Sequence, residues 1–217
     1  MFNNIEAAIF DMDGTLIDSM WVWKSINHEF LAKRNLSVPD DLKRDIEHLS
    51  FEQSAQYFKD RFNIEDTVED IIIEWNDMAS YSYANNVKLK PGAREYLALL
   101  KEKGLKLGLA TSNYSKLVEV TLKNNDIFEF FDAITTTWEV KKEKNFPDVY
   151  LLTAKKLDVD PSKCMVFEDI LPAVMGAKLA GMKVIGVQDE HSLDQKEEII
   201  KLSDLYIERY DELTKAV

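Results

Sequence analysis

The sequence predicts an α/β protein in which a mainly parallel sheet is covered by helices on both faces and a helical unit is inserted after the first strand. Two observations lead to this prediction. Short apolar segments alternate with helical segments, as expected for parallel strands joined by crossover helices. Residues 18–89 have helical periodicity and no strand pattern, so they are expected to form a unit outside the sheet.

Six segments are predicted as strands because each is short, apolar and bounded by helical or turn patterns. They are residues 7–10, 106–110, 133–135, 165–167, 183–187 and 205–207. A Pro-Gly pair at 91–92 breaks the helical pattern of the insert, and a further helix is predicted at 93–103. We therefore expect residues 1–17 and 90–217 to form the body of the protein.

The insert, residues 18–89, contains four predicted amphipathic helices, at 19–33, 40–47, 51–62 and 68–84. Aromatic residues recur along these helices at helical spacing. We expect the following side chains to form the core of a bundle rather than a cage for a ligand: Trp21, Phe30, Tyr57, Phe58, Phe62 and Trp75. The insert is expected to leave and re-enter the body just beyond the first strand. It can therefore act as a lid over a site there, or it can simply extend the core.

Composition limits the classes of function. The chain has 217 residues and is 46% hydrophobic, enough for one substantial core and a smaller unit. It has no apolar run of membrane-spanning length, and its first residues do not resemble a signal peptide, so we expect a cytoplasmic protein. A formal net charge of −12 argues against nucleic acid or an anionic membrane as a partner. The single cysteine, Cys164, is expected to be a core residue.

Two aspartates, Asp11 and Asp13, directly follow the first predicted strand. The carboxyl ends of parallel strands are where sites lie in α/β proteins. Side chains two residues apart on an extended segment point the same way, so both carboxylates can share one site before Gly14 allows the chain to turn. Their like charges need a cation or a proton, and Mg²⁺ is bound by a few oxygen ligands together with water and phosphate. The run therefore predicts a magnesium site.

Two plainer interpretations of this run fit less well. A calcium loop needs further oxygen ligands and a glutamate at its end, whereas the apolar segment Thr15-Leu16-Ile17 follows here. A solvated acidic turn does not explain why the aspartates stand directly behind a buried strand. The run is thus interpreted as part of a catalytic site.

Four segments resemble, in the correct order, the four motifs of the haloacid dehalogenase-like (HAD) hydrolases. They are DMDGT at 11–15, LGLATSN at 107–113, Lys144 with FPDVY at 146–150, and MVFED at 165–169. Each motif alone is weakly specific, but the four together span almost the whole chain. The resemblance implies a Rossmann-like body, with the insert as the C1 cap of this family.

The resemblance also implies a role for each matching residue in phosphoryl transfer. Asp11 would be the nucleophile that forms an aspartyl-phosphate, and Asp13 would act first as an acid and then as a base. The Mg²⁺ ion would be held by Asp11, the main-chain carbonyl of Asp13 and Asp169. Glu168 would either bind the metal through water or only support neighbouring groups. The phosphate-binding residues would be Gly14, Thr111, Ser112, Asn113 and Lys144, of which Thr111 and Lys144 are also counted as catalytic.

Two of these assignments have alternatives. Thr111 can instead cap the helix predicted to begin near Tyr114. Lys144 lies in a lysine run, and Glu-Lys-Asn stands where the family has Gly-Lys-Pro, so Lys142 or Lys141 can replace it in the role. The position of Lys144 relative to the following Pro-Asp pair favours Lys144.

The predicted function is that of a Mg²⁺-dependent phosphatase that acts, as a monomer, on a small phosphorylated metabolite. The alternative is a sugar phosphomutase of the β-phosphoglucomutase kind. In proteins of that kind the cap loop typically carries basic residues around a glycine. The corresponding residues here, 47–52, have the sequence EHLSFE, which departs from that pattern. A non-catalytic regulatory phosphate-binding module is less favoured, because it leaves the acidic residues unexplained. Within the cap, His48 and Phe51 are predicted to determine substrate specificity.

Overall fold

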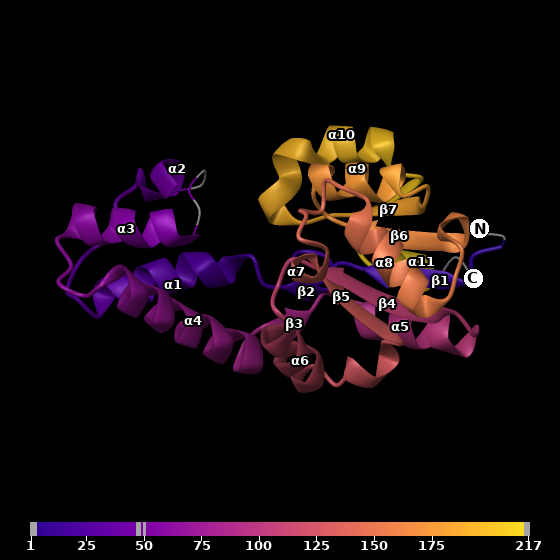
Figure 1. The fold of residues 1–217 in the computed structure, drawn as a ribbon, viewed down its shortest axis with the longest axis horizontal. Helices are drawn as coiled ribbons and strands as arrows, with labels where there is room; N and C mark the ends of the chain where they lie inside the picture. Colours follow the sequence, from indigo (N-terminus) through magenta and orange to yellow (C-terminus); the bar gives the residue numbers. More distant parts are fainter. Residues whose placement is uncertain (1–3, 47–48, 50, 215–217) are drawn as a thin grey trace. The chain divides into compact units, whose positions relative to one another are not determined.

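The structure is a computed structural model that describes residues 4–46, 49 and 51–214. The chain forms two compact units. The first, here called the body, comprises Met1–Ser19 and Val87–Val217. The second, here called the insert unit, is Met20–Asn86. Figure 1 shows the course of the chain through both units.

The body is built on a six-stranded sheet in the order β5-β4-β1-β6-β7-β8, with every neighbouring pair parallel. The strands are β1 (Ala7–Phe10), β4 (Lys106–Thr111), β5 (Ala133–Thr136), β6 (Cys164–Glu168), β7 (Lys183–Val187) and β8 (Leu205–Ile207). The predicted parallel α/β fold is therefore confirmed. The six predicted strands lie where the sequence places them, and their ends shift by no more than one residue, because these runs are apolar on both faces.

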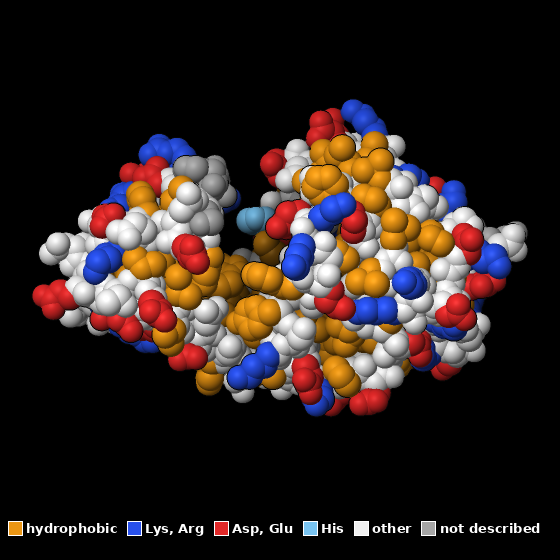
Figure 2. Space-filling view, viewed as in Figure 1, with side chains coloured by type: hydrophobic (Ala, Val, Ile, Leu, Met, Phe, Trp, Pro, Cys, Tyr) orange, Lys and Arg blue, Asp and Glu red, His pale blue; other side chains and the backbone are white. Residues whose placement is uncertain are grey.

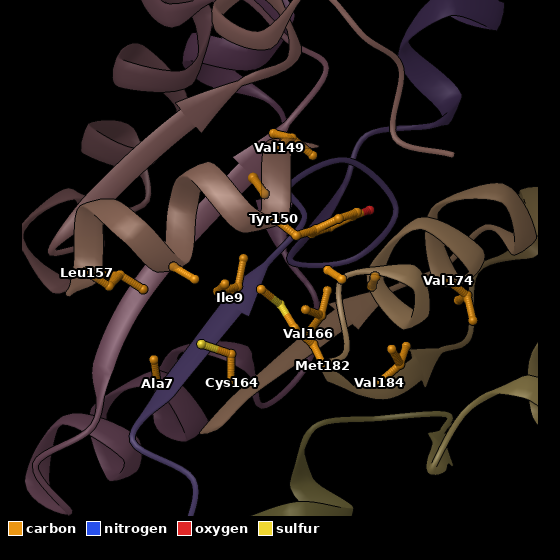
Figure 3. Packing of buried hydrophobic residues seen from close by; sticks show 14 of the residues in the cluster. Ala7, Ile9, Val149, Tyr150, Leu157, Cys164, Val166, Val174, Met182 and Val184 are labelled. Atoms are coloured by element: carbon orange, nitrogen blue, oxygen red, sulfur yellow. The ribbon is translucent and has the colours of Figure 1, made fainter. Parts of the chain in front are cut away.

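Helices cover both faces of this sheet. On one face, α8 (Asp148–Leu157), α9 (Leu171–Leu179) and α10 (Lys196–Leu202) pack on a buried cluster that includes Ile9, Val166 and Cys164 (Figure 3). On the other face, the rings of Phe10 and Phe167 stack and contact aromatic side chains of α5 (Ala93–Glu102) and of the segment before α11 (Asp211–Thr214). The alternation of side chains along β1 places Ile9 and Phe10 on opposite faces. Cys164 is a core residue, as predicted.

The remaining elements of the body connect these layers. They are α5 (Ala93–Glu102), α6 (Ser115–Asn124), α7 (Thr137–Val140), α11 (Asp211–Thr214) and the 3-10 helices η1 (Phe128–Phe130), η2 (Pro161–Lys163) and η3 (Glu190–Gln195). Hydrophobic side chains gather on the surface over α9 and α10 (Figure 2). Met175 and Leu179 of α9 and Ile200 of α10 are about half exposed or more.

The insert unit consists of four helices: α1 (Trp21–Ala32), α2 (Leu42–Ile46), α3 (Phe51–Phe62) and α4 (Val68–Asn85). Its core is aromatic, with Phe30, Phe58 and Trp75 buried in mutual edge-to-face contacts. Tyr57 and Phe62 are half-buried at the edge of this core. The prediction that Trp21 is a core residue was wrong. It is 39% exposed, because it is the first residue of α1 and has no preceding turn to cover it.

Two short strands join the ends of the insert, and the sequence analysis missed them. Residues Ile17–Asp18 (β2) and Lys88–Leu89 (β3) pair antiparallel, with Ile17 opposite Leu89. The prediction that no strand occurs between 18 and 89 was therefore wrong at both ends of this range. Two residues are too few for an alternating pattern to be recognised. No helix in the described part of the chain is long and apolar enough to span a membrane.

Candidate active site

The predicted motifs meet at the carboxyl ends of three neighbouring strands. Strand β1 pairs with β4 on one side and with β6 on the other. Asp11 follows β1, Thr111 ends β4, and Glu168 and Asp169 stand at the end of β6. Residues far apart in sequence are thus brought to one edge of the sheet because the strands are parallel and adjacent. All four side chains are buried.

Lys144 supplies a buried positive charge at this edge. Its Nζ lies 2.5 Å from Oδ1 of Asp11 and also contacts Oε1 of Glu168. Burial alone would lower the pKa of Lys144, but the neighbouring Asp11 and Glu168 carboxylates outweigh it, so this pKa is raised and the side chain stays charged. Of the three candidate lysines, Lys144 is the one that reaches the site. Lys142 binds Asp148 at the surface, and Lys141 ends α7.

A glycine in α9 allows the Lys144 loop to approach so closely. A Cβ atom on Gly176 would lie 1.9 Å from the main-chain oxygen of Lys144 and 2.9 Å from that of Phe146. The first distance is far below 3.0 Å, the shortest contact that a Cβ normally makes, and the second is just below it; backbone atoms cannot move aside as a flexible side chain can. Gly176 is therefore required for the Lys144 loop to lie against α9.

The acidic residues form a tight cluster. One ligand oxygen each from Asp11, Glu168 and Asp169 lie within 4.8 Å of one another. Burial raises the pKa of Glu168 well above its ordinary range, although Lys144 opposes this. Burial, and then the nearby Asp11 charge, raises the pKa of Asp169 to about 7 against a hydrogen bond from Thr15. Such shifts are expected where like charges are held together without a cation.

The cluster fits a hard divalent cation. Carboxylate oxygens in small number are the ligands that Mg²⁺ takes from proteins. Oε2 of Glu168 is fully buried and accepts no hydrogen bond from the described residues, which a bound ion or its water would correct. Asp169 is oriented by the Thr15 hydroxyl, which donates to its Oδ1 at 2.8 Å. Such hydrogen bonds to a ligand are typical of metal sites.

Asp13 is held by donors from two other segments. The Ser19 hydroxyl lies 2.7 Å from its Oδ1, and the side-chain amide of Asn113 lies 3.0 Å from its Oδ2. The Thr111 hydroxyl accepts a hydrogen bond from the main-chain N–H of Asn113 at 3.1 Å. No side-chain cap hydrogen bond is present at α6, so Thr111 does not cap that helix.

Not every predicted residue can be placed at this edge. His48 lies outside the described residues. Phe51 belongs to the insert unit, where it is 38% exposed and its ring contacts those of Trp23 and Trp75. Ser112 follows Thr111 and is exposed. Three residues that contact the acidic side chains were not predicted as site residues from the sequence: Thr15, Ser19 and Tyr150. Tyr150 looked like an ordinary apolar position of α8, because only its hydroxyl distinguishes it from core residues.

Comparison with known proteins identifies the family. Residues 8–187 match the family described as haloacid dehalogenase-like hydrolase. The chain belongs to this family. It is 29% identical to a phosphorylated carbohydrates phosphatase of Thermotoga maritima over 210 residues, 96% of each chain. It is 32% identical to hexitol phosphatase B of Escherichia coli strain K12 over 216 residues, which covers 97% of this chain and 95% of that protein.

A solved structure agrees with the sequence relatives. A presumed beta-phosphoglucomutase of Thermotoga maritima superposes with a TM-score of 0.88 and is 28% identical, over 98% of this chain and all of the other. Family membership together with these near full-length relatives makes the protein a phosphatase of the HAD class.

Proposed function

We propose that this protein is a Mg²⁺-dependent phosphatase that hydrolyses a small phosphorylated sugar or polyol through an aspartyl-phosphate intermediate. The observation that carries the proposal is the contact between Lys144 and Asp11 within the cluster completed by Glu168 and Asp169. A nucleophilic carboxylate held by a buried cation, beside an acidic cluster that fits a metal ion, is the arrangement that phosphoryl transfer to a carboxylate requires.

The reaction would use the two aspartates in turn. A carboxylate oxygen of Asp11 attacks phosphorus, and the bond from phosphorus to the ester oxygen breaks. Asp13 gives a proton to the leaving alkoxide, then takes one from the water that hydrolyses the acyl phosphate and regenerates Asp11. Ser19 and Asn113 hold the Asp13 side chain in place for both proton transfers.

The remaining residues would bind and orient the phosphoryl group. Lys144 and the Thr111 hydroxyl would contact its oxygens, and main-chain N–H groups near Gly14 and Ser112 would add donors. A bound Mg²⁺ ion would neutralise charge on the phosphoryl oxygens. The ligands we assign to it are Asp11, the main-chain carbonyl of Asp13 and Asp169, with Glu168 directly or through water.

The two named phosphatases support a substrate of the phosphorylated carbohydrate or hexitol class. The test is a panel of hexose, hexitol, glycerol and nucleoside monophosphates assayed with Mg²⁺ and with EDTA, with released phosphate quantified. We expect the sugar and polyol phosphates to be hydrolysed and EDTA to abolish turnover. Preference for nucleotides would refute the substrate class, and full activity in EDTA would refute the metal.

A substitution tests the nucleophile. Asp11→Asn is nearly isosteric but cannot form the acyl phosphate, so we expect kcat to fall by about a thousandfold or more while the fold is retained. Asp126→Asn makes the same chemical change at a side chain that is 85% exposed and serves as the matched control. Trapping of labelled phosphate on wild type but not on Asp11→Asn would support the intermediate, and activity of Asp11→Asn near that of wild type would exclude it.

A sugar phosphomutase is the second candidate, and the likeness to the presumed beta-phosphoglucomutase favours it. The two activities differ in the fate of the phosphate. Hexose 1-phosphates are therefore assayed with and without a hexose bisphosphate, and both isomerised sugar and free phosphate are measured. Isomerisation without net release of phosphate would replace our proposal with the mutase.

We further infer that the insert unit acts as the cap that selects the leaving group. Phe51 presents a partly exposed ring beside Trp23. If this ring contacts the sugar, Phe51→Ala should change the order of kcat/KM values across the panel, whereas Lys144→Ala should lower all of them alike. Tyr81→Ala, at a side chain of α4 that is 66% exposed, is the control. An unchanged order in Phe51→Ala would contradict this role.

A further inference from the structure

Tyr150 places a polar group at an unexpected position of the hydrophobic core. It is a fully buried residue of α8, and its ring belongs to the cluster between this helix and the sheet. Figure 3 shows the ring lying across the cluster with its hydroxyl at the end away from Ile9 and Leu157. A buried tyrosine hydroxyl usually has a specific partner, because leaving it unpaired is costly.

The partner of this hydroxyl is the buried acid Glu168. The Tyr150 hydroxyl lies 2.8 Å from Oε1 of Glu168 and 3.2 Å from the main-chain oxygen of Ala173. The hydroxyl has a single hydrogen, and a bond to a charged carboxylate is shorter and stronger than a bond to a neutral carbonyl. The geometry therefore favours donation to Glu168.

The same oxygen of Glu168 also contacts Lys144, so both protein donors meet at Oε1. The other oxygen, Oε2, is buried and has no partner among the described residues. Both donors therefore bind one oxygen of the Glu168 carboxylate, and the other oxygen can bind a further ligand. Asp11 and Asp169 each offer an oxygen within 4.8 Å of an oxygen of Glu168, and on their own these two charges would repel the Glu168 carboxylate.

We propose that Tyr150 is a positioning residue for the metal ion: with Lys144 it fixes Oε1 of Glu168 and so directs Oε2 toward the cation. The inference rests on the metal site of the proposed function, and it gives Tyr150, the last residue of the third motif segment, a role that the family resemblance does not assign. Tyr150 touches neither phosphate nor metal, and it acts through Glu168.

The role of the hydroxyl follows from the freedom of a glutamate side chain. The terminal torsion of Glu is broad and roughly two-fold, so it does not by itself fix which oxygen faces which neighbour. Without the phenol, Glu168 can turn both oxygens toward the ammonium of Lys144. The cation site then competes with Lys144 for the carboxylate, and affinity for the metal falls.

The first experiment measures metal binding without substrate. Mg²⁺ affinity is determined by calorimetry, and Mn²⁺ affinity by electron paramagnetic resonance, for wild type, Tyr150→Phe and Tyr96→Phe. Tyr96 is a matched control because it is also buried in the body but packs against the rings of Phe167 and Tyr210. We expect Tyr150→Phe to raise both dissociation constants about tenfold, the lower end of the effect of removing support from a metal ligand. Tyr96→Phe should change them less than about twofold.

A double-mutant cycle separates this role from a general effect on the fold. In the Glu168→Gln background the hydroxyl has no carboxylate to orient, so adding Tyr150→Phe should cause little further loss of metal affinity. Thermal unfolding of each variant is recorded, and phenylalanine retains the ring that fills the cluster. An equal loss in both backgrounds, or unchanged affinity in Tyr150→Phe, would overturn the inference.

The outcomes also separate this inference from the proposed function. Metal binding that weakens in Tyr150→Phe, in a protein that hydrolyses no phosphate ester, would refute the phosphatase and support the positioning role. Phosphatase activity with metal affinity insensitive to Tyr150→Phe would refute the positioning role alone. A wild-type protein that binds neither cation would refute both.

Discussion

Gly14 provides a direct test of the proposed metal site, because the methyl group added in Gly14→Ala would contact the Asp169 side chain. Its φ angle is +79°, and an added Cβ would lie 2.3 Å from Oδ2 of Asp169. Contacts shorter than 3.0 Å essentially never occur for a Cβ, so in Gly14→Ala the new Cβ and the Asp169 oxygen must move apart by at least 0.7 Å, the difference between these distances.

Two costs follow, and they can be separated. The left-handed backbone conformation costs alanine about 1–2 kcal/mol, which lowers the Tm by roughly 2–8 °C in a protein of this size. Displacement of Asp169 is a second effect, because metal–ligand distances are defined to within about 0.2 Å and Mg²⁺ tolerates distortion poorly. We expect Mg²⁺ affinity to fall about 10- to 100-fold, as when a ligand loses its support.

Gly104→Ala is the matched control. Gly104 has the same φ angle of +79°, but an added Cβ would meet no atom within 4 Å. Calorimetric titration with Mg²⁺ and thermal unfolding in EDTA are measured for both variants. Both should lose the stability that the left-handed backbone costs an alanine, Gly14→Ala should lose more because of its clash, and only Gly14→Ala should lose metal affinity. Equal Mg²⁺ affinity in the two variants would refute the assignment of Asp169 as a metal ligand.

Three further outcomes are expected. Burial raises the pKa of Asp169 to about 7, so between about pH 4 and pH 7 the metal-free folded protein holds a proton that the unfolded chain has released. The stability of the metal-free protein should therefore fall as the pH rises through this range. Thermal scans in EDTA that show the opposite trend would contradict this. The largely buried pair between Lys90 and Asp189, 2.8 Å apart, should make Lys90→Met cost about 3–5 kcal/mol in urea unfolding, whereas Lys163→Met at an exposed pair should cause little loss of stability. Asp13→Asn should retain more activity on a phenolic than on an alkyl phosphate, since the better leaving group needs less proton transfer; equal loss on both would exclude Asp13 as the acid.

The spacing of apolar residues along short segments was sufficient to predict the sheet and most helices of this protein. Strands such as 7–10 and 183–187 have the predicted bounds because burial on both faces leaves an apolar run that a short window detects. The edge at which Asp11 and Asp169 meet was also predictable, since parallel strands place their carboxyl ends together. Helix ends and very short strands were less predictable, as Trp21 and the β2–β3 pair demonstrate.

The fold class, the family resemblance and the acidic strand ends can all be derived from the residues alone. Which of the three neighbouring lysines reaches Asp11 depends on the path of the loop against Gly176, and this path is known only from the folded chain. The hydrogen bond from the Tyr150 hydroxyl to Glu168 was likewise found only in the folded structure. The physical reason is that periodicity reports which face of an element is buried, whereas a site is made by contacts between residues distant in sequence, whose distances are fixed by packing.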